Sequence, residues 1–318
     1  MPHRVLVCDP FQPEGISILR GAGLIVDYEP AITREELLEK IGGYHAVIVR
    51  SRTRMDGEII EKADSLRIIV RAGVGLDNID LEAARAKGVR VESTPEALTQ
   101  SVAELTIGLI LAVLRRIAYA DQSMKKGEWI KRQLIGQELK GKTVGVVGVG
   151  GRIGLQVSKM LVHGFQAEVV GYDVIDVSGK AVEIGFKPVA SLDELLPIAD
   201  IVTLHVPYLP STHHLIDGER IERMKDGAIL INTSRGRIVD GEALLHAIRR
   251  GKIAGAGLDV YHDEPPREGW ELELISHPAT VCTCHIGAQT VEAQKTAAVL
   301  AAELVIQGLK NAASPQPI

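Results

Sequence analysis

Short apolar runs alternate with amphipathic segments along most of the chain, and this alternation predicts the fold. Before residue 92, apolar runs at 4–8, 46–50 and 66–71 predict buried strands, and segments at 35–41, 57–63 and 80–86 predict helices. A second series of apolar runs lies at 143–148, 168–173, 200–206, 228–234, 254–260 and 280–284. Strands that alternate with helices form parallel sheets with helices on their faces. The pattern therefore predicts an α/β protein of two Rossmann-like, doubly wound parallel-sheet domains with a cleft between them.

A long apolar segment separates the two series. Thr94 as N-cap and Pro95 in the first turn predict a helix that runs to about Ala120. It is apolar on nearly all sides, so we expect it to be buried between domains or against a second subunit. The last helix, from Gln289 to about 308, is expected to pack back on the N-terminal domain. The expected domains are thus 1–94 plus 287–318 and 95–286, with a tail at 311–318.

Residues 143–173 have the order strand, glycine turn, helix, strand, acid. Gly148, Gly150 and Gly154 give G-x-G-x-x-x-G with Gly151 as an additional glycine, so the pairing of amides with phosphates stays open. Asp173 lies 19 residues after Gly154, near the position of the acid that binds ribose hydroxyls. Because no Arg or Lys occurs at 174–176, NAD is expected rather than NADP. The alternative is an ordinary strand–helix turn.

Composition narrows the class of protein. The chain has 318 residues and a formal net charge of −5, which argues against non-specific binding of nucleic acid. Its first ten residues contain a strand instead of a signal peptide, and the apolar stretch Leu105–Leu114 is too short to span a bilayer. The three cysteines fit a reducing compartment, and no Cys/His quartet predicts a metal. We expect a cytoplasmic protein with no membrane, metal or nucleic-acid partner.

Three residues at strand ends could carry chemistry on a small molecule. Arg235, Glu264 and His285 each follow a different predicted strand, at the edge where open α/β sheets bind ligands. A guanidinium can bind a carboxylate, and an imidazole can transfer a proton. The alternatives are a surface cation beside Gly236, a solvated turn residue before two prolines, and a structural histidine.

Several stretches together resemble the D-isomer-specific 2-hydroxyacid dehydrogenases over essentially the whole chain: residues 70–80, the glycine turn, and residues 231–240, 258–265 and 284–288. The resemblance implies that Arg235, Glu264 and His285 are catalytic. His285 would exchange a proton with the substrate hydroxyl, and Glu264 would orient its ring and favour its protonated form. Arg235 would bind the substrate carboxylate and polarise the reacting oxygen.

The resemblance also implies binding residues. Those in the second domain would contact NAD: Gly148, Gly150, Gly151, Arg152, Ile153, Gly154, Asp173, His205, Pro207, Thr212, Thr233, Asp259 and Gly287. The first domain would bind substrate, with the backbone amides of Gly73, Val74 and Gly75 facing its carboxylate.

The substrate is suggested by two further segments, 49–54 and 127–139, which resemble 3-phosphoglycerate dehydrogenases. Arg50, Arg71 and Arg132 would then bind a phosphate, which needs more than one cation, and Ser51 would contact the substrate beside them. This implies oxidation of D-3-phosphoglycerate to 3-phosphohydroxypyruvate in serine biosynthesis, by a short form without a regulatory C-terminal domain. The apolar helix from Pro95 leads us to expect a homodimer. If these arginines are only solvated charges, the alternative is a reductase of glyoxylate, hydroxypyruvate or another small 2-keto acid. An alternative of another class is an NAD(H)-sensing corepressor, although the chain retains all three catalytic positions.

Overall fold

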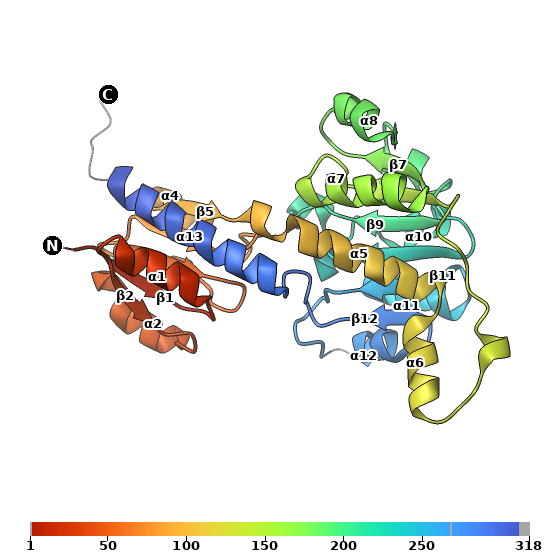
Figure 1. Ribbon diagram of the computed structural model, residues 1–318, viewed down its shortest axis with the longest axis horizontal. Coiled ribbons are helices and arrows are strands. Elements are labelled where there is room, and N and C mark those ends of the chain that lie inside the picture. Colours follow the sequence, from red (N-terminus) through yellow and green to blue (C-terminus); the bar gives the residue numbers. More distant parts are fainter. Residues whose placement is uncertain (1, 268, 312–318) are drawn as a thin grey trace. The chain divides into compact units, whose positions relative to one another are not determined.

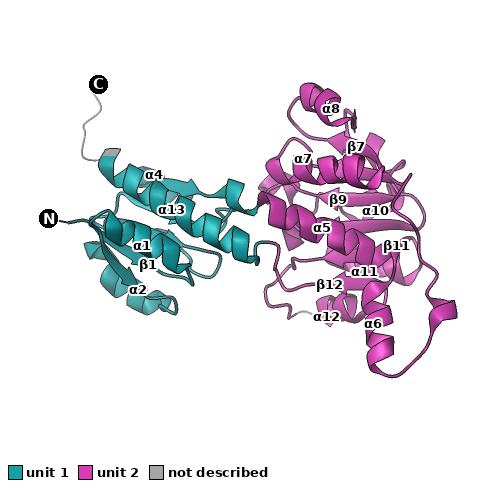
Figure 2. Cartoon of the chain, in the orientation of Figure 1, with its two compact units in different colours: residues 1–98, 288–318 teal, residues 99–287 magenta. Residues whose placement is uncertain are grey.

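The computed structural model describes residues 2–267 and 269–311, which form two compact units (Figures 1 and 2). Unit 1 combines the chain up to Leu98 with the segment from Ala288 onward, and unit 2 is Thr99–Gly287. The sequence had suggested divisions after residues 94 and 286. Of the expected tail at 311–318, all but Asn311 lies outside the described residues.

Unit 1 contains a five-stranded parallel sheet in the order β2-β1-β3-β4-β5. The strands are β1 (Arg4–Val7), β2 (Ile25–Tyr28), β3 (Ala46–Val49), β4 (Ile68–Arg71) and β5 (Arg90–Ser93). β3 and β4 are buried along their whole length, as expected for central parallel strands. β2 and β5 lie at the edges and mix polar with apolar residues, which explains why the pattern did not predict them.

The helices of unit 1 are α1 (Pro13–Gly21), α2 (Arg34–Lys40), α3 (Gly57–Lys62), α4 (Leu81–Ala86) and α13 (Val291–Asn311), with a short 3-10 turn at Ile41–Gly43. Thr33 caps α2 through its hydroxyl, which accepts a hydrogen bond from the Glu36 amide. α13, at the end of the described chain, packs on α1 and β4 of the N-terminal sheet (Figure 1).

Unit 2 contains a seven-stranded parallel sheet in the order β12-β11-β10-β9-β6-β7-β8. The strands are β6 (Thr143–Val147), β7 (Glu168–Tyr172), β8 (Lys187–Pro188), β9 (Ile201–Leu204), β10 (Ala228–Asn232), β11 (Ile253–Leu258) and β12 (Thr280–Cys282). The strand order reverses between β6 and β9, which creates the switch point where such sheets bind ligands. The predicted α/β fold with two doubly wound parallel sheets is confirmed.

The helices of unit 2 are α5 (Thr99–Leu114), α6 (Ile117–Lys125), α7 (Arg152–Lys159), α8 (Ser178–Ile184), α9 (Leu192–Leu195), α10 (Gly218–Arg223), α11 (Gly241–Arg249) and α12 (Gly269–Ser276). Single 3-10 turns of unit 2 lie at Lys131–Gln133, Pro210–Thr212 and Gly236–Ile238, and α7 continues into a π-helical turn at Met160–Gly164. A further 3-10 turn at Pro95–Leu98 belongs to unit 1 and directly precedes α5.

The prediction of one helix from Pro95 to Ala120 is wrong. The segment begins as a 3-10 turn, α5 ends at Leu114, and Arg116 adopts a left-handed backbone conformation with φ of 52° before α6 begins. The carbonyl of Leu114, which a continuing helix would use, instead accepts the amide of Gln137 at 3.0 Å. The returning segment therefore competes with the helical hydrogen bond and ends the helix.

α5 packs on α7, β10 and β11 within unit 2. By length and composition alone, Pro95–Leu114 could cross a bilayer, since its 20 residues have a mean hydropathy of 1.8 in the most apolar window. The stretch Leu105–Leu114, which by itself is too short to span a bilayer, is only the second half of this segment. Half of the window is nevertheless buried inside the folded chain, as in the core helices of soluble proteins.

Candidate active site

A histidine–glutamate pair lies beyond the carboxyl ends of β11 and β12. His285 Nδ1 and Glu264 Oε2 are 2.6 Å apart, and the second oxygen of Glu264 accepts the Tyr261 amide at 3.2 Å. Because an ionised carboxylate only accepts hydrogen bonds, Nδ1 must be the donor. His285 Nε2 is then left as the nitrogen that can take a proton from a ligand.

Arg235 lies beyond β10, the strand next to β11, on a turn built by a buried asparagine. The Asn232 side chain accepts the Ser234 amide at 3.0 Å and donates to the Arg235 carbonyl at 2.8 Å. The Ser234 hydroxyl adds a bond of 2.7 Å to the carbonyl of Leu204 on the neighbouring strand β9. The residue that carries the guanidinium is therefore fixed by its own local sequence.

The positive charge of Arg235 contributes to lowering the pKa of the Glu264 carboxyl. Burial by itself would raise the pKa of the Glu264 carboxyl, but the His285 hydrogen bond and charge, the Tyr261 amide and the Arg235 charge together outweigh it. The pKa of Glu264 is consequently lowered from its ordinary value, and this carboxylate stays ionised at neutral pH. Arg235, Glu264 and His285 thus form one electrostatic group within unit 2.

Asp259 anchors the loop that carries His285. It is 1% exposed, and its carboxylate accepts the Thr283 hydroxyl at 2.6 Å and the amides of Ile286 and Gly287 at 2.8 and 2.9 Å. The His285 amide donates to the Asp259 carbonyl at 2.8 Å, and His285 has a left-handed backbone with φ of 54°. Most of the hydrogen-bonding capacity of this carboxylate is therefore used inside the protein, and the cofactor role suggested for Asp259 stays a prediction.

The glycine turn between β6 and α7 fits a dinucleotide. Gly148 has a φ of 84°, and a Cβ on Gly154 would lie 2.3 Å from the Gly148 carbonyl oxygen, so neither position tolerates a side chain. Gly151 is the N-cap of α7 and provides no side-chain cap, which leaves the first amides of the helix available to a phosphate. The Asp173 carboxylate accepts the Gly150 amide at 2.8 Å, so this carboxylate is held against the glycine turn.

Lys180 is a neighbour of this turn that the sequence did not indicate. Its Nζ donates to the Gly150 carbonyl at 2.9 Å, although it lies seven residues after Asp173 and on helix α8. The sequence comparison of cations considered only residues 174–176, and so it did not include Lys180. The Lys180 ammonium is bound to the glycine turn itself.

The other residues predicted to bind the cofactor lie around the same carboxyl edge. Arg152 and Ile153 form the first turn of α7, and the Thr233 hydroxyl is 3.0 Å from that of Thr106. The Thr212 hydroxyl donates to the Pro207 carbonyl at 2.7 Å and closes a small turn. His205 follows β9, and dense packing lowers its pKa to about 3, which keeps its imidazole neutral.

The residues predicted to bind substrate lie in unit 1, on loops that follow β3 and β4. Arg50 and Ser51 come directly after β3, and Ser51 is exposed. Arg71 ends β4 and is 9% exposed, and its guanidinium lies so close to Gly73 that a Cβ there would overlap it. Gly73, Val74 and Gly75 continue this loop, of which Val74 is exposed. Among the described residues there is no cluster of His, Cys, Asp or Glu that could hold a metal.

Residues 107–287 match the NAD binding domain of the D-isomer specific 2-hydroxyacid dehydrogenases. The chain belongs to this family. Unit 2 contains the matched segment, so the sequence resemblance and the expectation of NAD as cofactor are both confirmed.

Within the family, the chain is 44% identical over 308 residues to a D-3-phosphoglycerate dehydrogenase of Methanocaldococcus jannaschii. That alignment covers 97% of this chain but only 58% of the relative, so the chain spans little more than half of its length. A hydroxypyruvate reductase of Thermotoga maritima is 40% identical, with 96% of this chain and 98% of the relative covered. The solved D-lactate dehydrogenase of Aquifex aeolicus, in complex with NAD and lactic acid, has a TM-score of 0.85 and 30% identity, covering 97% and 96% of the two chains.

Motif resemblance missed the residues of this chain that hold others in place. Asn232 is one of them, because its side chain holds the turn that carries Arg235. Glu271 on α12 is another, and its carboxylate accepts three backbone amides: those of His262 at 2.9 Å, Asp263 at 3.2 Å and Arg267 at 3.3 Å. Glu271 is 2% exposed, and the residues that it binds lie on both sides of Glu264 in the sequence. For Asn232, the sequence Asn-Thr-Ser at a predicted turn could have indicated a side chain that binds the turn backbone. For Glu271, no local pattern indicates its role, because it meets its partners only in the folded chain.

Proposed function

We propose that the protein is an NAD-dependent oxidoreductase of D-2-hydroxy acids, in which Arg235, Glu264 and His285 are catalytic. The observation that carries this proposal is the 2.6 Å contact of His285 Nδ1 with Glu264 Oε2, with the Arg235 charge acting on the same carboxylate. A proton-transfer group and an anion clamp are the two elements that the oxidation of a hydroxy acid requires.

In the oxidation direction, His285 Nε2 accepts the proton of the substrate hydroxyl. Glu264 holds the ring through Nδ1 and stabilises the imidazolium, because its carboxylate is ionised. Arg235 binds the substrate carboxylate and polarises the oxygen that becomes the ketone. NAD, when bound at the glycine turn, supplies the acceptor for the hydride. In the reduction direction, His285 returns the proton to the carbonyl oxygen.

The substrate that we propose is D-3-phosphoglycerate, with 3-phosphohydroxypyruvate as the product and serine biosynthesis as the context. Arg50 and Arg71, at the ends of neighbouring strands, offer two cations to a phosphate. The relative from Methanocaldococcus jannaschii is a D-3-phosphoglycerate dehydrogenase, which supports the same substrate.

The second candidate is a reductase of hydroxypyruvate or glyoxylate. It is favoured by the Thermotoga maritima hydroxypyruvate reductase, which matches this chain over nearly its whole length. An unphosphorylated acid has no second anionic group, so this candidate does not need Arg50.

A panel of 2-hydroxy and 2-keto acids, followed by NADH absorbance, distinguishes the two candidates. We expect the highest kcat/KM with 3-phosphoglycerate and 3-phosphohydroxypyruvate. Loss of the Arg50 guanidinium in Arg50→Ala should raise the KM for 3-phosphoglycerate about ten-fold or more, the usual cost of a charged hydrogen bond. A KM that Arg50→Ala barely changes would favour the reductase, and no turnover of any acid would favour an NAD(H) sensor.

We also propose a cytoplasmic homodimer. Cys8, Cys282 and Cys284 are all free thiols, which supports a reducing compartment. The segment 117–137, called the arm below, leaves α5 and returns at Gln137 (yellow in Figure 1). It carries Trp129 and Ile135, which are 78% and 87% exposed. Large apolar side chains with such exposure favour contact with a second copy of the chain.

A further inference from the structure

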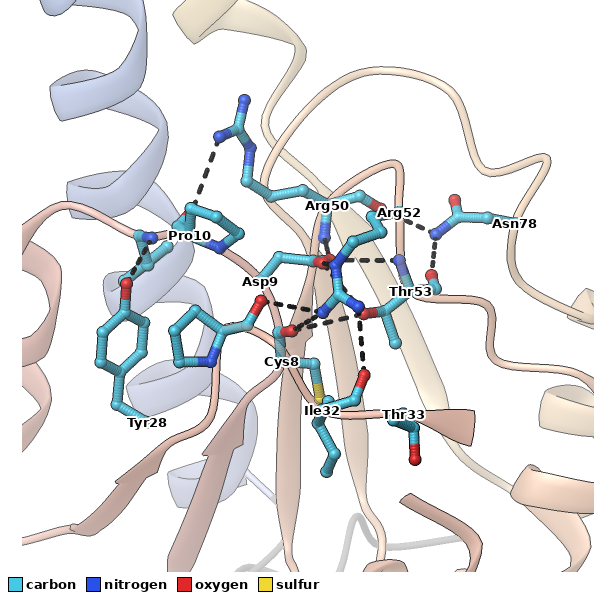
Figure 3. A network of polar contacts seen from close by, with 12 residues as sticks. Cys8, Asp9, Pro10, Tyr28, Ile32, Thr33, Arg50, Arg52, Thr53 and Asn78 are labelled. Carbon is cyan, nitrogen blue, oxygen red and sulfur yellow. Dashed lines mark hydrogen bonds and ion pairs between the residues drawn. The ribbon is translucent and has the colours of Figure 1, made fainter. Parts of the chain in front are cut away.

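Asp9 lies just beyond β1 and faces the turn Arg50–Thr53, which follows the adjacent strand β3 (Figure 3). Its side chain is 2% exposed. The carboxylate accepts the backbone amide of Arg50, and it accepts the hydroxyl and amide of Thr53 at 2.9 and 3.4 Å. One buried carboxylate therefore binds the turn at its first and last residues.

Asn78 holds the same two residues from the other direction. Its Nδ2 donates to the carbonyl of Arg50 at 2.7 Å and to that of Thr53 at 2.6 Å. The Asn78 carbonyl accepts the Met55 amide at 2.8 Å, so the loop that follows Gly73–Gly75 is joined to the segment after the turn. At both ends of the turn, amide and carbonyl are thus held by side chains.

The two arginines of the turn have different surroundings. Arg52 donates through Nε to Asp9 at 3.0 Å, through Nη1 to the Ile32 carbonyl at 3.1 Å, and through Nη2 to the carbonyls of Cys8 and Pro30. Among the described residues, the Arg50 guanidinium makes one hydrogen bond, of 3.4 Å, to the Pro10 carbonyl. In Figure 3 the Arg50 side chain extends away from the network into which the Arg52 guanidinium points.

The network costs free energy that ordinary packing would avoid. A buried carboxylate must be compensated by a cation and by hydrogen bonds, and apolar residues of similar volume often give equal or greater stability. The Asp9 carboxylate instead fixes the conformation of the backbone that carries Arg50 and Ser51. A cation held on a rigid backbone loses less conformational entropy when it binds an anion.

We propose that Asp9 and Asn78 are positioning residues that hold the turn Arg50–Thr53 so that Arg50, and not Arg52, is presented to the anionic end of the substrate. This rests on the proposed function, because it concerns the affinity for the hydroxy acid. Neither residue touches the reacting atoms, so their loss should act on KM and leave kcat nearly unchanged.

The test compares Asp9→Asn with Asp27→Asn in the full chain. Asp27 is a matched control, because it lies in the same unit and binds Arg4 and Tyr44, at 2.8 and 2.9 Å, but not the turn. In Asp9→Asn one of the two carboxylate oxygens becomes an NH2 donor and the charge is lost. The side chain can then no longer accept both from the amides of Arg50 and Thr53, which share one oxygen, and from Arg52 Nε and the Thr53 hydroxyl, which share the other. We expect the KM for 3-phosphoglycerate to rise about ten-fold or more at nearly constant kcat, while Asp27→Asn changes it less than about two-fold.

Two further measurements separate positioning from a general loss of stability. Amide hydrogen exchange at Arg50 and Thr53 should accelerate in Asp9→Asn and not in Asp27→Asn. In the background Arg50→Ala, Asp9→Asn should have no further effect on KM, because residues that act through the same group are not additive. If Asp9→Asn does not fold, Asn78→Ala replaces it, with the same expectations.

Unchanged exchange at Arg50 and Thr53, a fall in kcat at constant KM, or full additivity with Arg50→Ala would each overturn the positioning role. The proposed function fails differently. If the wild-type protein turns over only an unphosphorylated acid, the substrate assignment fails, and the KM part of this inference fails with it because such an acid does not need Arg50. The exchange rates still test whether Asp9 holds the turn. If it turns over no acid, the dehydrogenase proposal fails together with the substrate part of this inference, whatever the exchange rates are.

Discussion

His285 combines an exposed imidazole with a backbone conformation that few residues other than glycine adopt. The left-handed φ of 54° is maintained by the bond of its amide to the Asp259 carbonyl and by the next two amides, which Asp259 binds through its carboxylate. Such strain persists only where the surroundings fix it, and it is typical of functional positions. The conformation directs the ring to Glu264.

We predict that His285→Ala lowers kcat by about 10²–10⁴-fold, the usual contribution of a general acid–base group. The affinity for NAD should hardly change, because the glycine turn and Asp173 do not depend on this ring. Steady-state rates and a titration with NAD measure the two quantities. His246→Ala, an exposed substitution on α11, is the control. An unaffected rate in His285→Ala would remove this residue from the mechanism.

His205 makes the stability of the fold depend on pH. Its pKa is lowered to about 3 by desolvation, whereas an unfolded histidine takes up a proton near 6.5. Between these values the unfolded chain binds more protons than the folded one, so the free energy of unfolding decreases as the pH falls from about 6.5 to about 3. The contribution of one group is at most about 1.4 kcal/mol per pH unit.

Urea unfolding of the wild-type protein and of His205→Gln at several pH values in this window tests the prediction. The carboxylates contribute equally to both proteins, so the difference between the two isolates His205. We expect the advantage of His205→Gln over the wild type to grow as the solution is made more acidic. Parallel curves would contradict a desolvated, neutral histidine at this position.

At the scale of elements, the glycine turn is linked to the end of β7, because the Gly150 amide donates a hydrogen bond to Asp173, the residue that follows this strand. Asp173→Ala removes both this bond and the acceptor for the ribose hydroxyls. We expect the Kd for NAD to rise about ten-fold or more, as for the loss of a charged hydrogen bond, with a smaller change for NADP. Fluorescence titration with both cofactors gives the ratio.

Asp176→Ala is the matched control for this change, because the Asp176 carboxylate binds only Ser178 among the described residues. A preference for NAD that is the same in Asp173→Ala and Asp176→Ala would show that Asp173 does not select the cofactor.

Helix α12 fastens the loop before it through Glu271, whose buried carboxylate accepts three backbone amides. Glu271→Ala leaves these amides without an acceptor and should lower the free energy of unfolding by about 3 kcal/mol. Glu273→Ala, on the same helix, removes an exposed ion pair with Arg249 and should cost less than about 1 kcal/mol. Equal urea midpoints for the two variants would contradict the role assigned to Glu271.

The helices and strands that could be predicted from the sequence are those whose own residues show the full hydrophobic pattern. Central strands such as β3 and β10 are continuous apolar runs, whereas β8 is two exposed residues and could not be recognised. The break after Leu114 also escaped prediction, because it depends on the amide of Gln137, more than twenty positions away. The candidate site divides in the same way. Arg235, Glu264 and His285 lie in recognisable motifs, but Asp9, Asn78 and Lys180 gain their partners only when the chain folds.

At the scale of the whole molecule, the arm should hold two copies of the chain together. The wild-type protein is expected to sediment as a dimer at micromolar concentration, since Trp129 and Ile135 would lose their exposure in the interface. Trp129→Asp combined with Ile135→Asp should shift sedimentation towards the monomer. Val182→Asp, an equally exposed apolar position on α8, is the control and should not. A wild-type monomer would exclude the dimer.

The return of α13 to the first sheet has a consequence for synthesis. The helix packs on α1 and β4, so the sheet of unit 1 is completed by residues that are translated only after the whole of unit 2. Thr99–Gly287 must emerge from the ribosome in between, which takes on the order of ten seconds or more at typical rates. During that delay the part of the N-terminal sheet that α13 covers, including Ile68, is open to chaperones and proteases. The contiguous second unit can fold while it is being translated, and the first must wait until α13 has been translated.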